Sequence, residues 1–169
     1  MSFNHFDERG QAIMVDVSGK QPTLRTARAR ATVRMRPETL QTILEGRISK
    51  GDVFGVARLA GIAAAKKTPD LIPLSHPLAI HHAAVEFSPT PQTGEISVIA
   101  TVRAFERTGV EMEAMVAASV AALTVYDMCK GSDKGITIGE VTLLYKEGGK
   151  SGIYQRDGYD LNSEEGSEL

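Results

Sequence analysis

Apolar and polar residues alternate strictly along residues 25–36. Small apolar side chains occupy every second position from Ala27 to Met35, and arginine or threonine stands between them. A period of two residues is typical of a β-strand with one buried face and one polar face. We therefore predict a strand over 25–36. Its polar face would meet solvent or another subunit, or would hold phosphates, and it carries Arg28, Arg30, Arg34 and Arg36.

The longest apolar pattern runs from Gly109 to Lys130 and predicts a helix. It has no charged residue between Glu113 and Asp127, and alanine, the best helix former, recurs throughout. A helix that is apolar on every side is buried against neighbours all round. The apolar stretch is shorter than the roughly 20 residues that span a membrane. We therefore expect a core helix whose charges lie at its two ends.

The other segments predict short helices and further strands. Pro37 and Gly46 bracket a helix over 38–45, and a second helix runs from the capping residue Asp52 to Lys67. Strands are predicted over 79–88, 95–105 and 135–146, with a turn at 89–94. The order is strand, helices, strand, strand, helix, strand. It predicts an α+β, ferredoxin-like fold, in which helices pack on one face of an antiparallel sheet.

Length and composition suit one domain. The chain has 169 residues, of which 42% are hydrophobic. Because both ends are polar and lack periodicity, we assign a mobile segment to 1–13, a single domain to 14–153 and a disordered acidic tail to 154–169. The beginning lacks the apolar run of a signal peptide, so we expect a cytoplasmic protein.

Charge and cysteine content exclude several classes of function. The net charge of −2 gives no general attraction to nucleic acid. The single cysteine, Cys129, excludes an internal disulfide and a cysteine-rich metal site.

Several ionisable residues stand where they can serve a site or merely stabilise a helix. Asp127 and Lys130 share one helix face, either as a helix-end ion pair or as an acid and a cation at a site. Glu111 and Glu113 begin the same helix, where the helix dipole already favours negative charge. Lys50 precedes a helix N-terminus, where a cation is unfavourable, and this hints at a nearby anion.

Two further segments carry candidate polar groups. Pro77 forces His76 into an extended conformation, which suits either a structural histidine or an imidazole held in place. Residues 148–152 look like the end of a P-loop, but Leu144 occupies the required glycine position and no helix follows. What remains is a glycine-rich segment with Lys146 and Lys150 within reach of an anion. The whole set suits proton transfers on a phosphorylated substrate.

Six segments in order carry a resemblance to a known family. They are Met14–Ser18, Lys50–Val53, Asp70–Leu78, Gly109–Glu113, Tyr126–Lys130 and Gly148–Gly152. Together they closely resemble the cyclic pyranopterin monophosphate synthases, the molybdenum cofactor biosynthesis protein C family. The resemblance covers 14–152, which is nearly the whole predicted domain.

The resemblance implies a cytoplasmic lyase that acts on a cyclised dihydro-GTP made by a separate radical enzyme. The product is a pyranopterin with a cyclic phosphate, and diphosphate leaves. The resemblance further implies a homohexamer, a trimer of dimers, with neither nucleic acid nor membrane as a partner. No cofactor or metal site is required, and whether magnesium accompanies the triphosphate stays open.

The resemblance also assigns roles to residues. Asp127 matches the catalytic aspartate, and the other essential polar positions are Lys50, His76, Glu111, Lys130 and Lys146. Substrate contacts fall on Leu74, Ser75, His76, Met112 and Glu113. Ser75 departs from the family, in which many members have cysteine, and this casts doubt on a covalent role for that position.

Two questions remain open from the sequence. A ferredoxin-like domain can also be a non-catalytic sensor that holds a phosphorylated small molecule with the same lysines. Glu113 and Asp127 lie 14 residues apart, which is about 21 Å along one helix, so one chain does not present both to a compact site. We therefore predict sites at subunit interfaces, with Glu113 as a mere helix-start acid as the alternative.

Overall fold

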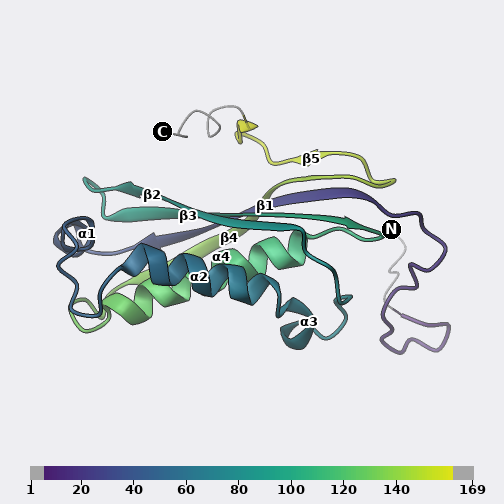
Figure 1. Ribbon diagram of the computed structural model, residues 1–169, viewed down its shortest axis with the longest axis horizontal. Helices are drawn as coiled ribbons and strands as arrows, with labels where there is room; N and C mark the ends of the chain where they lie inside the picture. The colour runs from purple at the N-terminus through teal and green to yellow at the C-terminus, as the bar shows by residue number, and fades with distance from the viewer. Residues whose placement is uncertain (1–5, 162–169) are drawn as a thin grey trace.

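The computed structural model describes residues 6–161 and shows an antiparallel sheet with helices on one face (Figure 1). The strand order is β2-β3-β1-β4-β5. The strands are β1 (Thr23–Arg34), β2 (His82–Thr90), β3 (Glu95–Glu106), β4 (Thr137–Glu147) and β5 (Tyr154–Gln155). The predicted α+β, ferredoxin-like class is confirmed.

The strict alternation of β1 places its alanines against the helices. Ala27, Ala29 and Ala31 are fully buried, whereas Arg34 on the opposite face is exposed. β3 pairs with β1 through Ala29 and Ala100, and β4 pairs on its other side. β1 stops two residues before the predicted end because Pro37 already begins the next helix.

Four helices lie in the described chain. They are α1 (Pro37–Leu44), α2 (Val53–Ala65), α3 (Thr68–Leu71) and α4 (Glu111–Cys129). Asp52 caps α2 as predicted, because its side chain accepts a hydrogen bond of 2.9 Å from the Gly55 N–H. α1 begins at Pro37. Proline has no backbone N–H, and it is tolerated here because an N–H in the first turn of a helix has no partner within the helix.

α4 is the central helix of the core. It is apolar and long enough to cross a membrane by composition alone, yet it packs against α2 and the sheet and buries residues along its whole length. Gly61 of α2 lies so close to α4 that a β-carbon there would stand 2.9 Å from the Ala117 carbonyl oxygen. Small residues thus let the two helices approach closely, and α4 is the buried helix that the sequence predicts.

Three details differ from the sequence prediction. β2 begins at His82 and not at Ala79, and the short helix α3 was not predicted. β5 pairs with β4 through Tyr154 and Lys146, at the start of the segment assigned to the tail. Residues 1–5 and 162–169, parts of the predicted mobile segment and acidic tail, lie outside the described residues.

Candidate active site

The two ends of α4 carry two separate clusters of predicted site residues. Glu111, Met112 and Glu113 form its first turn, whereas Asp127 lies in its last turn. Asp127 follows Glu111 by 16 positions, which correspond to about 24 Å at 1.5 Å per residue. The two ends lie on opposite sides of the molecule, the Asp127 end beside α1 (Figure 1). One chain does not bring all the predicted residues into one site.

At the first end, a lysine from the sheet holds the opening carboxylate of α4. Lys146 of β4 lies 3.0 Å from Glu111 Oε1, and both side chains are about 30% exposed. The other carboxylate oxygen, Oε2, is buried and bonds to no donor within residues 6–161. A buried carboxylate oxygen without a donor is rare in folded proteins.

Glu113 is buried beside this pair. Its residue is 2% exposed, and its Oε1 has no hydrogen-bond partner in the described chain. Burial raises the pKa of Glu113 to about 7, and the charge of Glu111 raises it further, against hydrogen bonds from its own backbone and from Ser75. At neutral pH this carboxyl group therefore exchanges a proton readily, as an acid or base catalyst must.

Ser75 and His76 approach the same end of α4 from the segment after α3. Ser75 reaches Glu113 with its side chain. The His76 ring is half-buried, and its Nε2 lies 2.7 Å from the carbonyl oxygen of Val15. Leu74 and Met112, also predicted as substrate contacts, are half-buried.

A cleft of about 740 Å³ opens at this end. Glu111 and Lys146 line it, together with the predicted glycine-rich loop. Basic side chains outnumber acidic ones in the lining of the cleft. Two residues are acidic, Glu111 and Glu147, and five are basic: Lys20, Arg25, Arg107, Lys146 and Lys150. The excess of positive charge suits a ligand that carries several phosphates.

The glycine-rich loop lies directly against Arg25. Gly148 and Gly149 have φ angles of 101° and 74°, and a β-carbon at Gly149 would overlap the Arg25 guanidinium. Arg25 is buried and donates to the Glu106 and Arg107 carbonyls at 3.1 and 3.2 Å. The two glycines are thus required for the loop to close over this arginine.

At the other end of α4, two lysines hold one carboxylate. Lys130 Nζ lies 2.7 Å from Asp127 Oδ1, and Lys50 Nζ lies 3.0 Å from Oδ2. Lys50 also donates to the Asp127 carbonyl oxygen at 2.7 Å. Hydrogen bonds from Lys130 and then Lys50 lower the pKa of Asp127, and Asp127 in turn raises the pKa of Lys130. The cluster is half-exposed and places two lysine side chains where an anionic substrate can reach them.

Cys129, between these residues, takes no part. It is buried, and burial raises the pKa of its thiol to about 11. A thiol that stays protonated is a poor nucleophile, so Cys129 serves as a small residue of the core.

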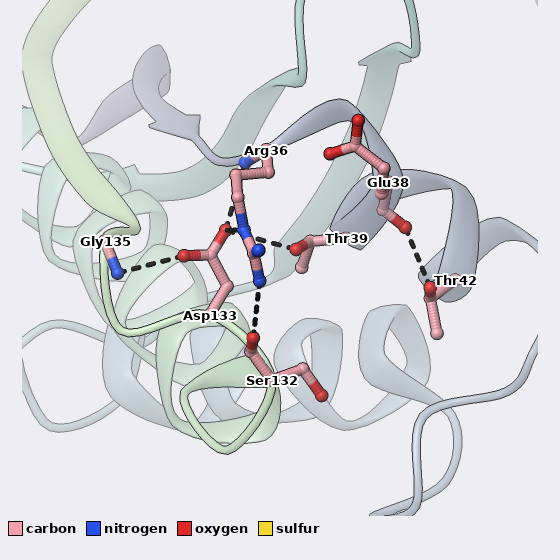
Figure 2. A network of polar contacts seen from close by, with 7 residues as sticks. All are labelled: Arg36, Glu38, Thr39, Thr42, Ser132, Asp133 and Gly135. Atoms are coloured by element: carbon pink, nitrogen blue, oxygen red, sulfur yellow. Dashed lines mark hydrogen bonds and ion pairs between the residues drawn. The ribbon is translucent and has the colours of Figure 1, made fainter.

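A buried aspartate that we did not predict anchors the loop after Lys130 (Figure 2). Asp133 accepts hydrogen bonds from the Arg36 N–H at 3.0 Å, the Thr39 hydroxyl at 3.1 Å and the Gly135 N–H at 2.9 Å. The Arg36 side chain also donates to the Ser132 carbonyl at 2.6 Å. The network ties the Asp127 end of α4 to the start of α1.

We expect Asp133→Ala to lower the free energy of unfolding by about 3 kcal/mol, because it leaves several buried donors unpaired. Backbone and side-chain hydrogen bonds lower the pKa of Asp133. Its contribution is therefore complete above the unfolded pKa of about 4 and is lost as the pH falls through the lower folded value. Urea unfolding between pH 3 and 7 measures both effects.

The control for this prediction is Thr42→Ala in α1, the helix whose first turn binds Asp133. The Thr42 side chain makes a single hydrogen bond, to the Glu38 carbonyl at 2.8 Å, also drawn in Figure 2. Its loss is expected to cost less than about 1 kcal/mol. Equal stability losses in the two variants would contradict the anchoring role of Asp133.

Glu113 predicts the opposite pH dependence. Because its folded pKa of about 7 lies above the unfolded value of about 4.3, the folded state binds the extra proton between these values. Stability is therefore expected to fall as the pH rises from about 4.5 to 7. At about 1.4 kcal/mol per pKa unit, the loss amounts to roughly 3 kcal/mol.

Glu113→Gln keeps the shape of the side chain and removes the titration. The difference in unfolding free energy between this variant and the wild type is expected to change by roughly 3 kcal/mol over that pH range, in favour of Gln at high pH. Chemical denaturation at a series of pH values provides the measurement. A constant difference would show that Glu113 is ionised with an ordinary pKa.

Comparison with known proteins identifies the same family that the six sequence segments resemble. The model of the MoaC family matches residues 14–149. A protein of Geotalea uraniireducens named cyclic pyranopterin monophosphate synthase is 85% identical over 157 residues, which are 93% of this chain and 98% of that protein. A protein of Geobacter metallireducens with the same name is 78% identical over the same shares.

A less similar relative also aligns with nearly the whole chain. Cyclic pyranopterin monophosphate synthase 1 of Mycobacterium bovis is 51% identical over 161 residues, which cover 95% of this chain and 94% of that protein. The match extends over both ends of α4 and over the glycine-rich loop. The chain therefore belongs to the MoaC family.

Proposed function

We propose that this protein is a cyclic pyranopterin monophosphate synthase, a phosphorus–oxygen lyase of molybdenum cofactor biosynthesis in the cytoplasm. It converts a cyclised dihydro-GTP into cyclic pyranopterin monophosphate and releases diphosphate. The names of the relatives support the activity. The observation that carries the proposal is the pair of polar clusters at the two ends of α4, of which one borders a cationic cleft.

The cleft would hold the phosphates. Lys146 precedes the glycine-rich loop, Lys150 lies within it, and Lys20 and Arg107 line the same space. Ammonium and guanidinium groups stabilise the charge that develops as diphosphate leaves. The proposal assigns no resident metal ion, because Lys146 already holds Glu111 and two lysines hold Asp127. Magnesium would enter bound to the triphosphate.

The ring rearrangement needs protons moved on nitrogen and oxygen. Glu113, with a pKa of about 7, gives and takes a proton at neutral pH. His76 lies next in the chain to Ser75, which contacts Glu113. Asp127 is held ionised and orients Lys50 and Lys130. The proposal thus adds an acid–base role to Glu113, which the sequence assigned to substrate contact.

Each complete site would combine the first end of α4 from one chain with the last end from another. The outer surface of the helix layer supports a dimer, since Val56, Leu59 and Leu123 are 43%, 70% and 56% exposed there. Val56 and Leu59 lie three residues apart on one face of α2. A two-fold axis through this layer would run the two α4 helices antiparallel and bring unlike ends together. Three such dimers would form the expected homohexamer.

Turnover tests the proposal directly. The purified protein mixed with the cyclised dihydro-GTP is expected to release one diphosphate per cyclic pyranopterin monophosphate formed. The control replaces Lys146 by methionine, which removes the charge in the cleft. If the substrate binds and returns unchanged, the protein is instead a sensor, and the enzymatic proposal is wrong.

A further inference from the structure

The segment Met14–Ser18 contributes to the resemblance but has no role in the chemistry described so far. In the structure it lies against the predicted site residue His76. The carbonyl oxygen of Val15 and the Nε2 atom of His76 are 2.7 Å apart, a strong hydrogen bond. This backbone group, 61 residues away along the chain, is a direct partner of the imidazole.

The chemistry of the two partners decides which ring nitrogen carries the hydrogen. A carbonyl oxygen can only accept a hydrogen bond, so His76 Nε2 must donate. A neutral imidazole carries one N–H, and its other nitrogen is then a bare acceptor. Within residues 6–161, Nδ1 makes no hydrogen bond. The neutral His76 ring therefore presents Nδ1 as its basic atom.

The segment is held so that the carbonyl keeps its place. Val15 and Val17 are half-buried, whereas Met14, Asp16 and Ser18 are exposed. Asp16 Oδ1 accepts from the Ser18 N–H at 2.8 Å and closes a turn, and the Lys20 N–H donates to the Val17 carbonyl at 3.0 Å. The turn leads directly to Gly19 and Lys20, which line the cleft. One short segment thus bonds His76 and forms part of the cleft wall.

We propose that Val15 is a positioning residue, whose carbonyl holds His76 as the Nε2–H tautomer and leaves Nδ1 to accept a proton during turnover. The tautomer follows from the geometry alone. Its catalytic meaning rests on the proposed function. The tautomer is measured without substrate, so failure of one claim is distinguishable from failure of the other.

Nitrogen NMR of the full chain labelled with ¹⁵N-histidine measures the tautomer, with signals assigned by single His→Gln variants. For neutral His76 we expect a protonated Nε2 and an unprotonated Nδ1. His81 is the internal comparator, because the Phe105 N–H donates to its Nδ1 at 3.3 Å and fixes the same tautomer by another contact. Protonation of His76 on Nδ1, or an average over both nitrogens, would overturn the proposal.

The variant Val15→Gly tests whether the segment is responsible. It removes the half-buried side chain and frees the backbone, so the His76 signals are expected to move toward a mixture of tautomers while those of His81 stay. We expect kcat to fall about tenfold, with KM nearly unchanged. This is less than the roughly 100- to 10,000-fold effect of general acid–base catalysis, because His76 itself remains in place. Val15→Ile is expected to retain both the tautomer and kcat.

Ile13→Gly is the matched control, since Ile13 directly precedes the segment and is 40% exposed. It is expected to leave the His76 signals and kcat as in the wild type. A fall of kcat in Val15→Gly without a change in the His76 signals would show a merely structural effect and refute the positioning role. A wild-type protein that shows the expected tautomer but no turnover would instead refute the proposed function.

Discussion

Asp127→Ala and Lys130→Ala are each expected to lower kcat at least about 100-fold, the usual effect of removing one preorganised charge from an active site. Asp127 holds two lysines at 3.0 and 2.7 Å, so its loss releases both cations from their fixed positions. Loss of Lys130 removes one cation and leaves Asp127 with Lys50 alone. Diphosphate release by the purified variants provides the measurement.

The fold is expected to survive both substitutions because all three side chains are about half-exposed. Arg34→Ala and Glu95→Ala are matched controls, since they break another half-exposed ion pair, at 2.9 Å on the sheet. These controls should retain kcat within about twofold. Normal turnover by either Asp127→Ala or Lys130→Ala would sink the assignment of this cluster.

Mixing two inactive variants is expected to restore activity, and this is the second large effect. Glu113→Ala damages the first end of α4, and Asp127→Ala damages the last end. If each site joins unlike ends of two chains, a mixed dimer has one site with both defects and one intact site. After random mixing by joint unfolding and refolding, about a quarter of wild-type activity should return.

The control mixes two variants with damage at the same end. Glu111→Ala with Glu113→Ala leaves every mixed site with one defect, so this mixture is expected to remain inactive. One variant of each mixture is labelled with ¹⁵N, so that the two chains differ in mass, and mass spectrometry of the intact assemblies confirms that chains have mixed. An inactive mixture of Glu113→Ala and Asp127→Ala, despite proven mixing, would place each site within a single chain.

Local patterns were sufficient to predict most of the fold. The alternation of Ala27 to Val33 indicated the buried face of β1, and the absence of charge between Glu113 and Asp127 indicated the core helix. The Asp127–Lys130 pair followed from helical spacing. β5 was not predictable, because two residues carry no periodicity and their pairing with β4 depends on tertiary context.

Contacts between distant segments were not predictable from the sequence. Lys50 was a predicted site residue, but its contact with Asp127 spans 77 positions. Asp133 was not predicted, and its contact with Arg36 spans 97 positions. The periodicity of a helix or strand relates only residues that are close in the sequence, so it does not predict such pairs. Arg25 was a nearer miss, since it shares the parity of Ala27 and Ala29 in β1 and so had to point inward. A charged residue on the buried face of a strand is itself a signal of a special role.

The length of α4 has a consequence for how this chain can vary. One inserted residue would turn everything beyond it by about 100° and advance it by 1.5 Å. In a dimer with unlike ends facing each other, this rotation and shift would displace site residues in both catalytic centres. On the proposed arrangement, the length of the helix would set the distance between two half-sites, so its residue count would affect function. Natural variants should therefore change the side chains along α4 freely within the limits of packing, while insertions and deletions fall in the loops outside it.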